Sequence, residues 1–216
     1  MASPAAPADG RAPVCRTGDP AELARAFAVR LAGVGGMRRA LAAWALGRDT
    51  LEGTLVKQRV EEGACHKGCA WCCRLEVEIG VAEAAHLARR AQADPELEAR
   101  LRANAARVAG LGEVARFRAA IPCAFLDLEN GACRVYEDRP LACRSYRSRD
   151  ADWCRSIMGA PSAPRVTPLI REGIGIRALI QRAVQEVTPP EHRARGELHA
   201  LTLRVLDAVT GSGRNR

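Results

Sequence analysis

The chain has 216 residues, and a chain of this length buries about 70% of the surface that its unfolded form exposes. Aromatic residues make up only 4% of it, so we expect one domain with a core of aliphatic side chains. The net charge is +8, but the excess lies in residues 155–216, where ten basic residues face five acidic ones. This distribution does not indicate a nucleic-acid groove, which needs concentrated positive charge and aromatic stacking partners.

No apolar stretch is long enough to cross a bilayer, and residues 1–18 contain no apolar run of the signal-peptide type. We therefore expect a soluble, cytoplasmic protein without a membrane partner, in which residues 1–18 are disordered. In a reducing compartment, clustered cysteines are more often metal ligands or redox groups than disulfides. Four disulfides would be the alternative in a secreted protein.

Helix signals precede the cysteines. Asp19 followed by Pro20 is typical of a helix N-terminus, and apolar residues then recur at helical spacing until the glycine pair Gly35-Gly36 interrupts them. The N-terminal helices at 19–62 are thus predicted as one helix ending near Val34, a second around Trp44 and a third over 51–60.

Helix signals also separate and follow the cysteines. Residues 81–91 have a helical pattern, and Asp94-Pro95 repeats the cap signature before a second helix that reaches Val108. This hairpin would bring the two groups of cysteines back together in space. In 159–210, apolar patterns over 176–187 and 198–209 predict a C-terminal helical pair, followed by a tail at 211–216.

Eight of the nine cysteines fall into two compact groups. Thiolates are soft ligands that suit zinc and iron–sulfur clusters, and the first group packs four of them into nine residues. We expect all eight to bind metal and treat Cys15 as an incidental thiol. The predicted ligands are Cys65, Cys69, Cys72 and Cys73 in the first group and Cys123, Cys133, Cys143 and Cys154 in the second.

Eight ligands allow two four-cysteine sites, or one cluster with four ligands and four other thiols. Cys72 and Cys73 point in divergent directions on a regular backbone, so we expect them to serve different metals or to differ in role. His66 lies inside the first group and is a further candidate ligand, although a lone histidine is more often solvated or hydrogen-bonded. Asn130-Gly131 predicts a turn within the second group.

The order and spacing of these residues resemble a known family. The pattern is Cys65-x3-Cys69-x2-Cys72-Cys73, then Pro122-Cys123, then Cys133-Arg-Val-Tyr136-Glu-Asp-Arg139-Pro140-Leu-Ala-Cys143-Arg144. It resembles the YkgJ-type cysteine-cluster family, described as a zinc- or iron-chelating domain, over about residues 65–155. The resemblance implies a metal site built from these cysteines.

Four thiolates around a divalent ion leave excess negative charge, which guanidinium groups can offset. An arginine directly follows Cys73, Cys133, Cys143 and Cys154, which fits this role. We expect Tyr136, Arg139 and Arg144 to pack against the bound cofactor and to offset its charge.

The sequence thus predicts a mostly α protein, a single helical domain with a loop-borne cysteine-rich metal site at 63–158. Its first predicted function is metal binding, with an iron–sulfur cluster or zinc as cofactor. The spacings of nine, nine and ten residues between the later cysteines favour iron–sulfur over paired zinc knuckles.

Two other functions remain open. The segment from Cys65 to Cys72 resembles the cluster motif of radical S-adenosylmethionine enzymes, which allows a methylase, although that superfamily uses repeated strand and helix units. A zinc-stabilised interaction module would instead engage a protein or nucleic-acid partner through a basic C-terminal segment, with Arg171, Arg177, Arg182, Arg193 and Arg195.

Overall fold

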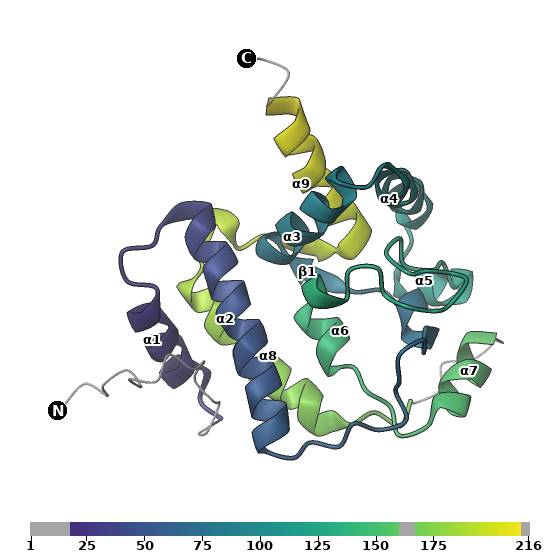
Figure 1. The fold of residues 1–216 in the computed structure, drawn as a ribbon, viewed down its shortest axis with the longest axis horizontal. Coiled ribbons are helices and arrows are strands. Elements are labelled where there is room, and N and C mark those ends of the chain that lie inside the picture. Colours follow the sequence, from purple (N-terminus) through teal and green to yellow (C-terminus); the bar gives the residue numbers. More distant parts are fainter. Residues whose placement is uncertain (1–17, 160–166, 213–216) are drawn as a thin grey trace. The chain divides into compact units, whose positions relative to one another are not determined.

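The computed structural model describes residues 18–159 and 167–212, and helices dominate these ranges (Figure 1). The prediction of a mostly α fold is confirmed, because the described residues add only one antiparallel sheet of two short strands. Cys15 and the predicted disorder of residues 1–17 lie outside the described residues.

The chain divides into two compact units. The first, called the helical unit, comprises residues up to 61 together with 171–193. The second, called the cysteine unit, comprises 62–170 together with the residues from 194 onward.

Three helices form the helical unit. They are α1 (Pro20–Arg30), α2 (Gly36–Lys57) and α8 (Arg171–Val187), and a 3-10 turn, η3 (Pro190–His192), follows the last of them. α1 begins as predicted, because the Asp19 carboxylate accepts a hydrogen bond of 2.8 Å from the N–H of Ala21. α8 packs against both α1 and α2, and the unit buries Phe27, Trp44 and Ile180.

α2 is one continuous helix where the sequence predicts two. Gly47 and Gly53 lie inside it without ending it, although a glycine costs a helix about 1 kcal/mol relative to alanine. Trp44 and Leu51 are fully buried along the same helix. Tertiary packing of this apolar stripe therefore outweighs the local cost of the two glycines.

The core of the cysteine unit is helical. Its helices α3 (Val81–Gln92), α4 (Pro95–Val108) and α9 (Leu198–Ser212) pack on one another beside the paired strands β1 (Glu78–Gly80) and β2 (Arg195–Glu197). The predicted helices between the two cysteine groups are thus present. The helices predicted as a C-terminal pair lie in different units, because α9 packs on α3 and α4 and α8 packs on α1 and α2.

Within the described ranges, no helix combines the length and the apolar character needed to cross a bilayer.

Five short elements connect this core to the cysteines. They are η1 (Trp71–Arg74), α5 (Glu113–Ala119), η2 (Tyr136–Asp138), α6 (Leu141–Ser145) and α7 (Ala151–Gly159). Cys123 and Cys133 pack directly against the apolar core, beside buried residues that include Leu87, Leu101 and Phe125. The core therefore supports one side of the cysteine-rich region.

A tight turn brings the two cysteine loops into contact. The Asp127 N–H donates to the Ala132 carbonyl at 2.8 Å, and the Gly131 N–H donates to the Asp127 carbonyl at 3.0 Å, which confirms the predicted turn just before Cys133. Gly131 has a φ of +71°, and a Cβ placed on it would lie 2.3 Å from the carbonyl oxygen of Gly68. Gly68 belongs to the first cysteine loop, so the two loops touch backbone to backbone here.

Replacing Gly131 with alanine should therefore destabilise the cysteine unit more than the same change at a glycine with free space. Gly110 is a matched control, because its φ is +74° and a Cβ placed on it would have no neighbour within 4 Å. We expect G110A to lower the free energy of unfolding by about 1–2 kcal/mol, the cost of a left-handed alanine. G131A should cost at least about 1 kcal/mol more through overlap with Gly68. Equal losses in chemical denaturation would contradict the close loop contact.

Candidate metal centre

The eight clustered cysteines all lie in the cysteine unit, and all are free thiols. Four lie on short helical elements, namely Cys72 and Cys73 on η1, Cys143 on α6 and Cys154 on α7. The other four lie on loops. The prediction that loops carry the ligands therefore holds for four of the eight cysteines.

Cys65, Cys69 and Cys154 form one neighbourhood, called the outer group. The thiols of Cys65 and Cys154 both act electrostatically on Cys69, and burial together with these thiols raises the pKa of Cys69. α7, which carries Cys154, packs on η1. The Ser148 N–H donates to Cys65 Sγ at 3.3 Å and helps to orient that thiol. Cys154 therefore lies near the first cysteine loop, although in sequence it follows Cys143.

Cys123, Cys133 and Cys143 form a second neighbourhood, called the inner group. Cys133 and Cys143 act electrostatically on Cys123, and Cys133 also acts on Cys143. Burial raises the pKa of Cys123 and of Cys143 to about 12, because desolvation disfavours a thiolate. Both thiols are therefore protonated in the metal-free chain at neutral pH.

Cys72 and Cys73, called the junction pair, connect the two groups. A hydrogen bond between their side chains raises the pKa of Cys72, and so does burial. The two side chains therefore lie within hydrogen-bond reach of each other on the 3-10 turn of residues 71–74, whereas the sequence predicts that they diverge. Whether they serve different metals stays a prediction. Cys72 acts electrostatically on Cys69 and Cys154 on one side and on the inner group on the other.

The thiols are neighbours but do not form a closed ligand sphere. Among the described residues, no three His, Cys, Asp or Glu side chains are already arranged to hold a metal ion. His66 is exposed, and its Nδ1 lies 3.1 Å from the Ala64 carbonyl oxygen in a local hydrogen bond. Metal binding would therefore require the thiols to move together.

Arg139 is the predicted charge-compensating residue that faces the thiols. Burial lowers its pKa, but Cys143, Cys133 and Cys72 outweigh this effect and raise it. Its Nη2 donates to the Cys143 carbonyl at 2.5 Å, and its guanidinium lies 5.1 Å from the centre of the Tyr136 ring. Arg139 is thus held from two sides next to the inner group.

Arg144 also acts on a thiol: burial raises the pKa of Cys133, and the charges of Arg139 and Arg144 oppose that effect. Arg144 donates to the carbonyls of Arg139 at 2.9 Å and Glu137 at 2.6 Å, and these hydrogen bonds connect α6 to η2. The ring of Tyr136 is mostly exposed and supports Arg139.

The arginines that directly follow cysteines also have other contacts. Arg74 and Arg155 lie over the Trp71 ring, at 5.5 and 6.0 Å from its centre. Arg134 donates to the Asp94 carboxylate at 2.8 Å. Position next to a cysteine in sequence therefore does not by itself identify the residues that act on the thiols, although Arg144 acts on Cys133.

Two buried polar residues that the sequence does not single out hold cysteine-bearing segments in place. The Glu83 carboxylate, on α3, accepts hydrogen bonds from the N–H of Gly80 at 2.8 Å and of Leu141 at 2.9 Å, which fixes the start of α6. His199 Nε2 accepts from the N–H of Ala124, next to Cys123, at 3.1 Å. Only the tertiary contacts reveal these roles, since Glu83 and His199 lie far in sequence from the cysteines they support.

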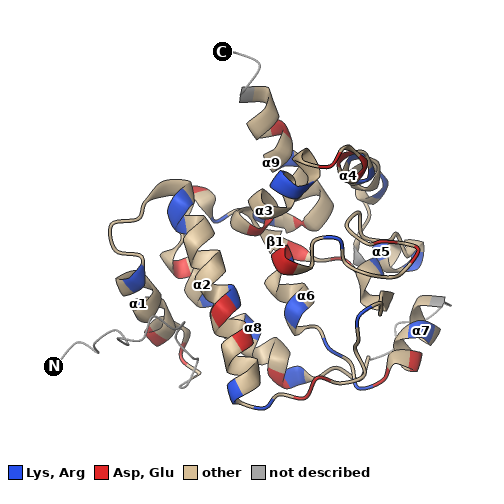
Figure 2. Ribbon diagram, in the orientation of Figure 1, with Lys and Arg blue, Asp and Glu red and all other residues tan. Residues whose placement is uncertain are grey.

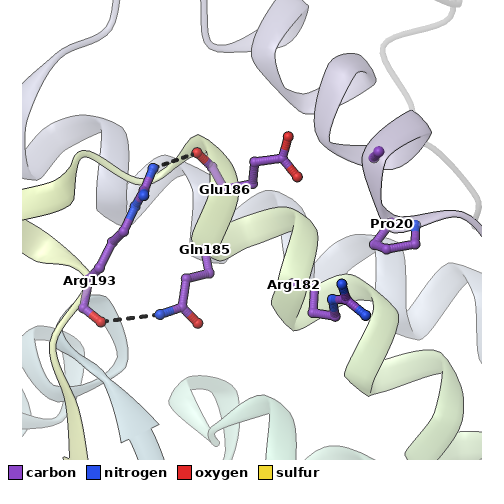
Figure 3. Close-up of a pocket in the computed structure, with 6 residues that line it drawn as sticks. Pro20, Arg182, Gln185, Glu186 and Arg193 are labelled. Atoms are coloured by element: carbon purple, nitrogen blue, oxygen red, sulfur yellow. Dashed lines mark hydrogen bonds between the residues drawn. The ribbon is translucent and has the colours of Figure 1, made fainter.

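The helical unit carries a shallow pocket without cysteines. Figure 3 shows its lining, in which Arg193 donates to the Glu186 carbonyl at 2.9 Å and Gln185 donates to the Arg193 carbonyl at 3.4 Å. These contacts engage the Arg193 guanidinium and the Gln185 amide within the helical unit. We therefore assign no ligand to this pocket.

The fold and the thiols define a cysteine-rich domain. Residues 64–158 match the family CxxCxxCC, whose description is "Putative zinc- or iron-chelating domain". This match confirms the predicted cysteine-cluster family for the segment 64–158. Neither a curated protein nor a solved structure matches the chain.

Metal binding should release protons. A metal binds the thiolate form of cysteine, and the raised pKa values of Cys123 and Cys143 mean that each ligated thiol must lose a proton at neutral pH. We expect Zn²⁺ binding by the metal-free chain to release about one proton per ligated thiol, and its affinity to rise from about pH 6 to about pH 8. Calorimetric titration in buffers of different ionisation enthalpy measures both quantities. Binding without proton release, at an affinity independent of pH, would contradict thiol ligation.

Proposed function

We propose that the cysteine unit binds two metal centres, each through four cysteines, and that these centres are iron–sulfur clusters. The outer group with one thiol of the junction pair would supply the first ligand set. The inner group with the other thiol would supply the second. The observation that carries this proposal is the regrouping of the thiols, with Cys154 beside Cys65 and Cys69 and with Cys72 between the two groups.

The donor set fits such a group. Eight thiols with few competing oxygen or nitrogen donors favour soft metals over calcium or magnesium. The family match supports zinc or iron. When bound, an iron–sulfur cluster supplies one-electron transfer, whereas zinc supplies a structural cross-link. The chain itself would hold the thiols near one another, orient Cys65 through Ser148 and offset thiolate charge through Arg139.

Iron–sulfur is the metal state that we propose, because the long and uneven spacings of the inner cysteines differ from the paired knuckles of structural zinc sites. Free thiols and oxygen-sensitive clusters both need a reducing environment. The proposal therefore places the protein in the cytoplasm, with a metal ion or cluster as its partner.

The other two functions gain no specific support. A radical S-adenosylmethionine enzyme uses repeated strand and helix units, whereas the described residues contain two short strands. An interaction module needs available basic groups, and two of the five predicted arginines have partners within the protein, because Arg193 donates to the Thr188 carbonyl and Arg195 pairs with Glu78. Figure 2 shows acidic and basic residues interspersed along the helices of both units.

Anaerobic purification followed by an absorption spectrum and elemental analysis tests the proposal. We expect a brown protein with a broad visible absorption band and with iron and acid-labile sulfide in equal amounts. A variant with serine at all eight clustered cysteines is the control and should be colourless. A colourless wild-type protein with stoichiometric zinc would contradict the iron–sulfur proposal but leave chelation intact. A protein without iron or zinc after reconstitution would contradict both.

A further inference from the structure

Arg116 is a buried arginine whose hydrogen bonds are incomplete. It lies on α5, and only 2% of its surface is exposed. Its Nη1 donates to the Arg74 carbonyl at 3.0 Å. Its Nε and Nη2 are buried and have no hydrogen-bond partner among the described residues. A guanidinium stays protonated in proteins, so a positive charge with free donors lies inside the cysteine unit.

Such an arrangement is costly unless a negative charge compensates it. Glu197 is near enough to act on Arg116 electrostatically, but both of its carboxylate oxygens are already engaged. Oε1 contacts His199 Nδ1 at 2.7 Å, and Oε2 accepts from the Ala200 N–H at 2.9 Å. The desolvation of Arg116 outweighs the acidic groups around it and lowers its pKa. The protein groups therefore leave the charge undercompensated.

Glu76 also acts on Arg116 but is exposed, and Arg107 acts on it with the opposite sign. The inner group is a further neighbour of Arg116. Arg74, whose carbonyl accepts from Arg116, directly follows Cys73, and the Cys73 carbonyl accepts from the Cys123 N–H at 2.7 Å. Cys123 is also near enough to act on Arg116 electrostatically when its thiol is ionised. The Arg116 guanidinium is thus bound to the backbone of residues 73–74, and the same backbone segment binds Cys123 of the inner group.

We propose that Arg116 is the internal counter-cation of the inner metal centre. Four thiolates around a metal carry excess negative charge, which a buried guanidinium stabilises in a region of low dielectric. Arg139 faces Cys143 and Cys133, and Arg116 lies near Cys123, so the two arginines act on different members of the inner group. This inference rests on the proposed function, because it requires the inner group to bind metal.

The two states of the protein should respond to loss of this charge in opposite directions. In R116M, the metal-free chain loses a buried, incompletely paired charge, so its free energy of unfolding should stay equal or increase. The metal-loaded chain loses its counter-charge, so Zn²⁺ affinity in a chelator competition should fall by about 10- to 100-fold. R118M is the matched control, because Arg118 lies on the same helix and is exposed. It should change neither quantity.

A second neutral variant keeps the test decisive if R116M does not fold. R116Q retains a donor for the Arg74 carbonyl but removes the charge, and it should weaken Zn²⁺ binding as R116M does. R116K keeps the charge and should retain most of the affinity. If wild type binds Zn²⁺ and the folded neutral variants bind it equally well, the role of Arg116 is overturned while the proposed function stands. If wild type binds neither Zn²⁺ nor iron, the proposed function itself fails.

Discussion

The hydrogen bond from the Cys123 N–H to the Cys73 carbonyl, 2.7 Å long, joins the two halves of the cysteine sequence. Fifty residues of chain separate its ends, and α3 and α4 occupy most of that interval. The core formed by these helices and α9 brings the ends together, so ordinary apolar packing places the thiols. Glu83 and His199 then fix the flanking segments through buried hydrogen bonds. The cysteine-rich region thus depends on a scaffold formed by other residues of the unit.

Charge is the second constraint on this region. Burial disfavours the thiolates and keeps the inner group protonated in the metal-free chain. Arg139 and Arg116 have the opposite effect, because each holds a positive charge beside these thiols. The metal-free chain therefore combines neutral thiols with a buried cation, Arg116, and a partly buried one, Arg139. A bound metal would convert this arrangement into thiolates that the arginines stabilise, so the electrostatics favour the loaded state.

Local signals predict the helices well and the tertiary arrangement poorly. The Asp-Pro caps locate α1 and α4, because a cap is a short-range hydrogen bond that the sequence encodes directly. The continuity of α2 and the separation of α8 from α9 depend on packing between distant segments. The same holds for the cysteines. Spacing alone places Cys154 with Cys143, whereas the packing of α7 on η1 brings it to Cys65 and Cys69.

The central claim is that metal ligands are grouped by tertiary structure rather than by position in the sequence. The metal content of purified single and double cysteine-to-serine variants tests it most directly. We expect C154S to lose as much metal as C65S, and the C65S/C154S double variant to lose no more than either. The C65S/C123S variant should lose the metal of both centres. If instead the metal losses of C154S and C65S add up in the double variant, while those of C154S and C123S do not, Cys154 belongs to the inner centre and the account is wrong.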